Sequence, residues 1–187
     1  MPLIFYIHGR FGSMVGDKVT QLKNHYGESV LIPLAYDPES PLTAQLTLIS
    51  QIEASLTHTQ DPKFMIVGSS IGAFWAARIA YHYGCPSVLI NPCYDPVKMI
   101  NSDLNELIKP LSTPISTDYD HHFFDLLIEQ QVDILLANHD ELFASFWPNL
   151  RDACPHCRFI HDSTSTHRFE NMPLLIEVID SVLKRMQ

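Results

Sequence analysis

The sequence has few charged residues and no cluster of basic ones. Charged residues make up 18% of the 187 positions, and 12 Lys and Arg against 21 Asp and Glu give a net charge of −9. Since no run of Lys or Arg appears, nucleic acid and anionic membrane surfaces are not expected as partners. No apolar stretch approaches the length that spans a bilayer, and no basic segment precedes an apolar one at the N-terminus. We therefore expect a cytoplasmic protein without a membrane segment.

Cysteine is scarce, and its pattern does not favour a metal or redox centre. In a cytoplasmic chain the four cysteines are expected to be free thiols: Cys85, Cys93, Cys154 and Cys157. The Cys154-Pro155-His156-Cys157 motif follows a helical pattern, whereas a redox dithiol usually begins a helix. A structural zinc site usually needs a second pair, and Asp120-His121-His122 has no matching ligand set either. We expect no metal and no cofactor.

The most informative stretch is an apolar run, residues 64–67, that leads into Gly68-Ser69-Ser70-Ile71-Gly72. A small-residue helical pattern follows at once. A buried strand, a sharp turn and a helix in this order are typical of a nucleophile elbow, with Ser70 at its apex. Side chains at Gly68 and Gly72 would collide with the neighbouring strand and helix. The alternative is an ordinary glycine-rich turn without chemistry.

Apolar patterns predict further strands and helices that alternate along the chain. Strands are expected at residues 3–7, 29–33, 64–67, 87–90, 132–137 and 158–161. Helices are expected at residues 17–26, 42–56, 71–83, 97–107, 123–129, 141–151 and 173–184. In the helix at 42–56, Leu46 is assigned to the buried face together with Ile49 and Ile52.

This alternation predicts an α/β fold: a compact three-layer sandwich with a mainly parallel six-stranded sheet. Ligands bind beyond the carboxyl ends of the strands in such sheets. No repeat or linker interrupts the sequence, so residues 1–187 are expected to form a single domain. An irregular, proline-interrupted segment at about 92–131 is expected to be a small cap-like insertion.

A serine nucleophile needs a base and an acid that orients the base, in the chain order Ser, acid, His. Asp140 follows the fifth predicted strand and His167 follows the sixth, so both are expected at the same sheet edge as Ser70. Alternatives stay open. Asp140 could instead cap a helix beginning near residue 141, and His167 could be merely solvated.

Other residues compete for the roles of acid and base. Asp95 and Glu141 are alternative acids. His139 and His161 are weaker candidates for the base by placement, and His8 violates the chain order although it could border the site.

An oxyanion needs two preorganised amide donors. One is expected to be the backbone N–H of Ile71, directly after the nucleophile. The other is expected in the loop after the first strand, where the amide of Arg10 is favoured and that of Phe11 is second. The Arg10 side chain could attract an anionic substrate or could simply be solvated.

The chain resembles the small bacterial esterases of the YqiA/YcfP-like family in the α/β-hydrolase superfamily. The resemblance is carried in one order by Tyr6-Ile7-His8-Gly9, Gly68-Ser69-Ser70-Ile71-Gly72, Asn91-Pro92, Asn138-His139-Asp140-Glu141 and Thr166-His167-Arg168-Phe169. It implies the α/β-hydrolase fold with strand order 2-1-3-4-5-6 and activity on short acyl esters. It also implies Ser70 as nucleophile, Asp140 as acid and His167 as base. Arg10 departs from the family pattern, which often has an apolar residue after His-Gly.

These observations predict a serine hydrolase that cleaves short-chain carboxylic esters through a Ser-His-Asp triad and an acyl-enzyme. The expected partner is a small-molecule ester. A thioesterase or acyltransferase with the same serine is an alternative. A non-catalytic binding protein on a hydrolase scaffold is another.

Overall fold

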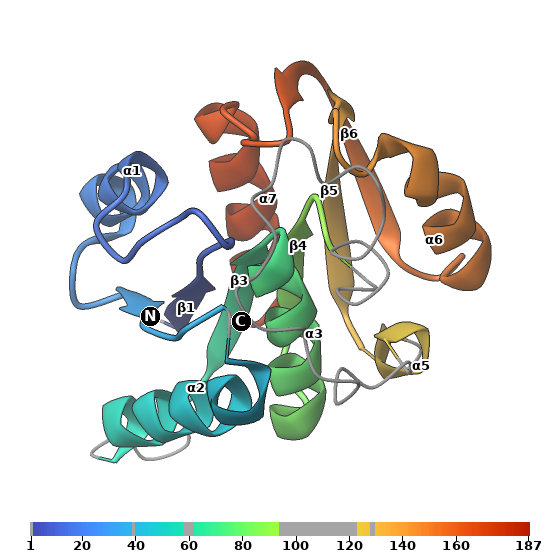
Figure 1. Ribbon diagram of the computed structural model, residues 1–187. Helices are drawn as coiled ribbons and strands as arrows, with labels where there is room; N and C mark the ends of the chain where they lie inside the picture. Colours follow the sequence, from blue (N-terminus) through green and yellow to red (C-terminus); the bar gives the residue numbers. More distant parts are fainter. Residues whose placement is uncertain (1, 39, 58–61, 94–122, 128–129) are drawn as a thin grey trace.

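The computed structural model describes residues 2–38, 40–57, 62–93, 123–127 and 130–187. Six strands form one sheet in the order β2-β1-β3-β4-β5-β6, and every neighbouring pair is parallel (Figure 1). The predicted strand order and parallel sheet are confirmed. The strands are β1 (Leu3–Ile7), β2 (Leu31–Leu34), β3 (Phe64–Ser69), β4 (Ser87–Ile90), β5 (Val132–His139) and β6 (Arg158–Thr166).

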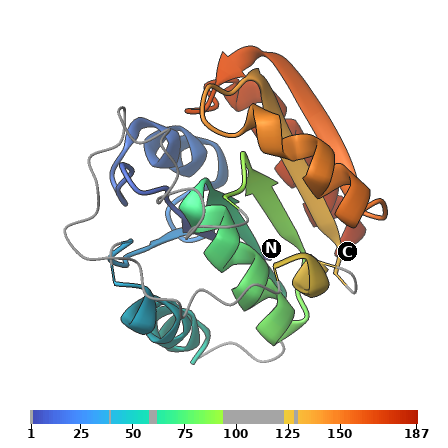
Figure 2. The same cartoon turned by 45° about the vertical axis from the view of Figure 1, so that its right-hand side comes forward.

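Helices cover both faces of this sheet and make the predicted three-layer sandwich. The helices of the described residues are α1 (Asp17–Tyr26), α2 (Pro41–Leu56), α3 (Ile71–Tyr83), α5 (Phe123–Leu127), the 3₁₀ helix η2 (Ala144–Phe146), α6 (Trp147–Ala153) and α7 (Met172–Arg185). The two views place α1 and α7 on one face and α2, α3 and α6 on the other (Figures 1 and 2).

The alternation of side chains along β1 explains the two apolar cores. Phe5 and Ile7 pack into a core with α2 and α3. Ile4 and Tyr6 point to the opposite face and pack with α1 and α7. Because successive side chains of a strand face opposite sides, one continuously apolar strand serves both layers.

The structure corrects the predicted burial of α2. Leu46 is 69% exposed, whereas Ala44, Leu48 and Ile52 are buried. The buried residues recur at intervals of four, which places them on one helical face that excludes Leu46.

The largest boundary differences from the prediction are at β6 and α6. β6 extends to Thr166 rather than ending at 161, because Asp162 and Ser165 are buried and hydrogen-bonded in its continuation. The helix expected at 141–151 is wrong at its start: residues 141–143 form turns, and α6 begins only at Trp147.

Most of the irregular segment at 92–131 lies outside the described residues. This applies to the helix expected at 97–107 and to the Asp120-His121-His122 motif. Where the structure describes this segment again, α5 packs on α3, with the Phe123 ring stacked on that of Phe74 at 5.9 Å. The single-domain organisation stays a prediction. None of the helices in the described ranges is long and apolar enough to cross a bilayer.

Candidate active site

Ser70 lies at the junction of β3 and α3 in a strained backbone conformation. Its φ angle is 57°, a region that non-glycine residues rarely adopt. The neighbouring strand β4 holds this turn: the Ser70 N–H donates to the Ile90 carbonyl at 2.9 Å, and the Ser70 carbonyl accepts from Cys93 at 3.2 Å. The turn therefore presents the serine hydroxyl above the carboxyl end of the sheet, as expected of a nucleophile elbow.

The two glycines that flank Ser70 have no room for a side chain. A Cβ atom at Gly68 would come closer than 3.0 Å to the backbone of α3 and to the Ala76 side chain. A Cβ atom at Gly72 would come equally close to the backbone of Ile7 and His8. These contacts are the collisions that the sequence predicted, and they explain why the motif needs glycine at both positions.

The structure brings Ser70, His167 and Asp140 into one line of hydrogen bonds. The His167 Nε2 atom lies 3.1 Å from the Ser70 Oγ atom, and the His167 Nδ1 atom lies 2.9 Å from the Asp140 Oδ2 atom. The Asp140 side chain is fully buried, and that of His167 is 16% exposed. Because a carboxylate only accepts hydrogen bonds, Nδ1 carries the imidazole proton and Nε2 is left to accept from the serine hydroxyl.

The Asp140 carboxylate also holds the turn that follows β5. Its Oδ1 atom accepts hydrogen bonds from the backbone N–H groups of Leu142 and Phe143, both at 2.8 Å. The capping and triad interpretations of Asp140 are therefore compatible, since each uses a different oxygen. The group it caps is a turn rather than the helix that the sequence predicted at residue 141.

Several contacts fix the position of the His167 residue itself. The Phe143 ring meets the imidazole edge-to-face at a centroid distance of 4.6 Å. The His167 N–H donates to Glu141 Oε2 at 3.1 Å, and the His167 carbonyl accepts from Asn91 Nδ2 at 2.9 Å. No function was predicted for Asn91 from the sequence. The sequence feature that could have pointed to Asn91 is its position before a proline at the end of a predicted buried strand.

The alternative acids and bases that the structure describes do not take the places of Asp140 and His167 in this arrangement. Asp95 lies outside the described residues. Glu141 contacts the backbone of His167 rather than its ring. His161 interacts with Asn138 at 3.1 Å, and His139 is exposed at the end of β5.

The loop after β1 approaches Ser70 closely, as an oxyanion hole requires. A Cβ atom at Gly9 would lie 3.1 Å from the Ser69 carbonyl oxygen and 3.2 Å from the Ser70 Cβ atom. The Gly12 N–H donates to the Gly9 carbonyl at 2.9 Å and closes a turn that contains Arg10 and Phe11. Ile71 is the first residue of α3, where backbone N–H groups lack a partner in the preceding helical turn. The oxyanion roles of Ile71 and Arg10 stay predictions.

A cavity of about 840 Å³ opens beside Ser70 and His167, a volume suited to a small organic ligand. Apolar side chains from three loops line it, including Phe11, Leu142 and Phe143. Among the described residues of its lining, three are cationic and three are anionic: Arg10, Lys18, Arg168, Asp17, Glu141 and Glu170. The described part of the lining therefore offers an apolar surface without an excess of either charge. His8 also borders it, as the sequence suggested.

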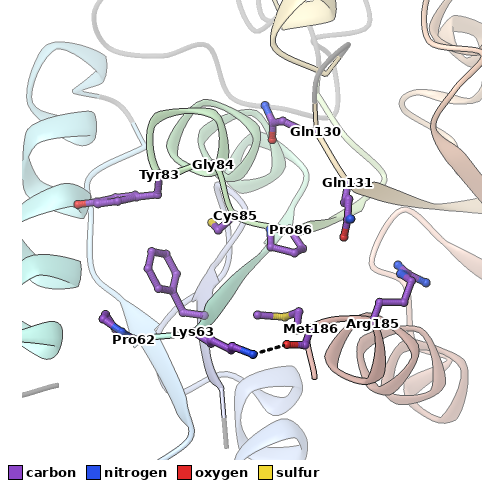
Figure 3. Close-up of a pocket in the computed structure, with 11 residues that line it drawn as sticks. Pro62, Lys63, Tyr83, Gly84, Cys85, Pro86, Gln130, Gln131, Arg185 and Met186 are labelled. Carbon is purple, nitrogen blue, oxygen red and sulfur yellow. Dashed lines mark hydrogen bonds between the residues drawn. The ribbon is translucent and has the colours of Figure 1, made fainter. Parts of the chain in front are cut away.

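A second cavity, of about 500 Å³, lies at the opposite edge of the sheet, where β3 and β4 begin (Figure 3). Its cationic groups are engaged: Lys63 donates to the Met186 carbonyl at 2.9 Å, and Arg185 pairs with Asp133 at 2.9 Å. Burial raises the pKa of the Cys85 thiol in its lining to about 12. That thiol therefore stays protonated at neutral pH and is a poor nucleophile.

The cysteines and histidines of the described ranges do not form a metal centre. No group of three or more His, Cys, Asp or Glu side chains within those ranges could hold a metal ion. The Cys154-Pro155-His156-Cys157 motif follows the end of α6 and precedes β6, as expected. Its two thiols are free and buried.

Comparisons with known proteins agree on the family and the fold. Residues 3–183 match the model of the family described as "Uncharacterised protein family (UPF0227)". A UPF0227 protein of Shewanella oneidensis is 30% identical over 94 residues, which are 50% of this chain and 52% of that protein. The match thus spans about half the length of that relative. A UPF0227 protein of Serratia proteamaculans is 22% identical over 174 residues, 91% of this chain and 92% of that protein.

The solved structures similar to this chain have the α/β-hydrolase fold. The mouse alpha/beta hydrolase domain-containing protein 10 superimposes with a TM-score of 0.71 at 18% identity, covering 100% of this chain and 91% of that one. The Pyrococcus furiosus esterase PF2001 has a TM-score of 0.71 at 14% identity, with coverage of 98% and 82%. The thioesterase domain from the curacin biosynthetic pathway has a TM-score of 0.65 at 12% identity, with coverage of 95% and 90%. The chain therefore belongs to the UPF0227 family and has the α/β-hydrolase fold.

Proposed function

We propose that this chain is a serine hydrolase that cleaves short-chain carboxylic esters. The observation that carries the proposal is the unbroken line of hydrogen bonds from Ser70 Oγ through the His167 ring to Asp140, at 3.1 and 2.9 Å. A serine hydroxyl is a weak nucleophile until a base accepts its proton, and this line supplies that base in the required tautomer.

In the proposed reaction the Ser70 oxygen attacks the acyl carbon while His167 Nε2 takes the hydroxyl proton. The carboxylate of Asp140 stabilises the imidazolium that forms and keeps its ring oriented. His167 then returns the proton to the alcohol oxygen as the ester bond breaks. A water molecule, activated by the same imidazole, attacks the acyl-enzyme and releases the carboxylic acid.

The tetrahedral intermediates carry a negative oxygen that needs fixed donors. We assign this role to the backbone N–H groups of Ile71 and Arg10. Ile71 begins α3, so the positive end of the helix dipole favours the oxyanion. The close approach of Gly9 to Ser70 supports a second donor from the same loop, in the turn that contains Arg10.

The lining of the cavity supports a neutral, partly apolar substrate. Phe11, Leu142 and Phe143 supply apolar surface beside the nucleophile, and the balanced charges do not favour a polyanion. An ester whose acyl and alcohol parts are both uncharged fits this lining best.

Turnover of p-nitrophenyl acetate and butyrate by purified protein tests the proposal. We expect wild-type protein to hydrolyse them and Ser70→Ala to lose at least about 10³-fold in kcat. Ser55→Ala is a matched control, because its hydroxyl bonds only the Gln51 carbonyl on α2 among the contacts of the described residues. Equal turnover by wild-type and Ser70→Ala protein would refute the mechanism.

A thioesterase would use the same serine, so substrates must separate the two activities. Oxygen esters and thioesters of the same acyl chain, assayed side by side, give kcat/KM for each. A preference for the oxygen ester supports the proposal, and a preference for the thioester replaces it. A non-catalytic binding protein would hydrolyse neither.

A further inference from the structure

We propose that Asn91 is a positioning residue that ties the acid-bearing strand β5 and the base-bearing His167 to the strand next to the nucleophile. The inference rests on the proposed function, because it assigns Asn91 a role in keeping that triad aligned. Asn91 follows β4 directly, and its side chain reaches neither Ser70 nor the His167 ring in the contacts that the structure describes.

The Asn91 carboxamide uses both of its ends on the triad-bearing segments. Its Oδ1 atom accepts from the Ala137 N–H of β5 at 2.8 Å, three residues before Asp140. Its Nδ2 atom donates to the His167 carbonyl at 2.9 Å and to the Thr166 carbonyl at 3.4 Å. One planar group therefore cross-links the segment that leads to the acid with the residue that carries the base.

The backbone around Asn91 extends this connection to the nucleophile. The Asn91 N–H donates to the Leu135 carbonyl of β5 at 2.8 Å. The residues on either side of Asn91-Pro92 hold the elbow, since Ile90 accepts from the Ser70 N–H and Cys93 donates to the Ser70 carbonyl. A stretch of four residues thus contacts the main chain at, or close to, all three members of the triad.

The chemistry of the position calls for asparagine. Residue 91 has a φ angle of 43°, and asparagine tolerates this left-handed conformation better than most residues. It is fully buried, so both polar ends need partners. Aspartate has the same shape but cannot donate when ionised, and it would place an anionic oxygen against the His167 carbonyl.

The His167 peptide groups are consequently held on both sides of its Cα atom. Glu141 accepts from the N–H and Asn91 donates to the carbonyl. These two hydrogen bonds hold the main chain from which the imidazole reaches Asp140 and Ser70. Releasing the carbonyl lets the loop after β6 shift, and a displacement of about 1 Å at a reacting group can lower the rate about a hundredfold.

Asn91→Asp tests the role, because the ionised carboxylate preserves the acceptor for Ala137 and removes the donor to the His167 and Thr166 carbonyls. We expect kcat for p-nitrophenyl acetate to fall by about tenfold to a hundredfold while KM changes by less than about threefold. A residue that served only stability would lower the melting temperature and leave kcat of the folded protein unchanged.

Two further variants keep the test decisive. Ser87→Ala is the matched control, since Ser87 is a fully buried polar residue at the other end of β4 from Asn91, and we expect wild-type kcat. Asn91→Gly removes the whole carboxamide and relieves the left-handed strain, so it supplies a folded variant if Asn91→Asp does not fold. Kinetics are measured on the variant that folds, Asn91→Asp or Asn91→Gly. If its kcat stays within about twofold of wild type, the positioning role is overturned.

Backbone ¹⁵N relaxation separates this inference from the proposed hydrolase activity. We expect lower order parameters for the His167 and Arg168 amides in Asn91→Asp than in wild type or Ser87→Ala. If wild-type protein has no esterase activity but this change appears, the proposed function fails and the cross-link stands. If wild-type protein is active and neither the order parameters nor kcat change in the variant, only the role of Asn91 fails.

Discussion

The two oxygens of the Asp140 carboxylate have different partners: one faces the His167 ring and the other accepts hydrogen bonds from a turn that contacts this ring. Oδ2 lies 2.9 Å from the His167 Nδ1 atom, while Oδ1 accepts from the N–H groups of the turn that presents Phe143 to the imidazole. One buried carboxylate therefore sets the tautomer of His167 and also holds the turn whose Phe143 ring packs against the imidazole.

Because the two oxygens have different partners, Asp140→Asn tests the role proposed for Asp140 in orienting His167. The backbone N–H groups of Leu142 and Phe143 require an acceptor, so they hold the new carbonyl oxygen at the Oδ1 position. The amide NH₂ then faces His167 Nδ1 and forces it to accept, which moves the imidazole proton to Nε2 and blocks removal of the serine proton. We expect kcat to fall by about 10³-fold to 10⁴-fold.

The same variant is expected to stay folded, because the turn keeps its acceptor. Its melting temperature and circular dichroism spectrum provide the control for the kinetic measurement. A loss in kcat below about tenfold would show that Asp140 serves the turn and not the histidine.

Gly72, two residues after Ser70, is expected to be intolerant of a single added methyl group. Gly72→Ala places a Cβ atom against the backbone of Ile7 and His8, which cannot move aside as a flexible side chain would. We expect the free energy of unfolding, measured with urea, to fall by about 2 kcal/mol or more.

Gly16→Ala is the matched control for this variant. A Cβ atom at Gly16 would meet Ser13 at an ordinary 3.6 Å, and the φ angle of −69° suits alanine. We expect a loss below about 1 kcal/mol, since only a cap preference changes. Equal losses in the two variants would contradict the steric explanation.

Asp162 is expected to make a pH-dependent contribution to the free energy of unfolding. Burial alone would raise the pKa of its carboxyl group, but hydrogen bonds from Ser165, Asn171 and Thr164 outweigh burial and hold the pKa at about 2, below the ordinary 3.8. The folded state thus favours the carboxylate. Its contribution of about 2 kcal/mol is complete above about pH 4 and is lost as the pH falls toward 2.

Urea unfolding of wild-type and Asp162→Asn protein at pH 6, 4 and 3 measures this contribution. We expect the variant to be less stable at pH 6, and the difference from wild type to shrink as the pH falls. A difference that stays constant between pH 6 and pH 3 would contradict the proposed role of the ionised carboxylate.

The parallel sheet and the meeting of Ser70, Asp140 and His167 could be predicted because they follow from general features of parallel sheets, whereas the strand order was implied by the resemblance to the YqiA/YcfP-like family. Each of the three residues comes directly after a predicted strand or in the loop beyond one, and the carboxyl ends of parallel strands share one edge. The pattern of apolar strands, the glycines that flank Ser70 and the chain order Ser, acid, His were sufficient for this inference.

Other features depended on contacts between distant segments. The helix expected at residue 141 is replaced by a turn because Asp140 captures the next backbone N–H groups. β6 continues through polar residues because Asp162 and Ser165 find partners near Asn171. Asn91 went unassigned because its partners, Ala137 and His167, are 46 and 76 residues away in sequence.

Mass spectrometry of protein treated with a fluorophosphonate probe tests the central claim most directly, because such probes react preferentially with an activated serine. The mechanism predicts one adduct per chain, located on Ser70 in the peptide that joins β3 to α3, and no adduct in Ser70→Ala. Unlabelled wild-type protein, or an adduct on any other residue, would contradict the assignment of Ser70 as the nucleophile.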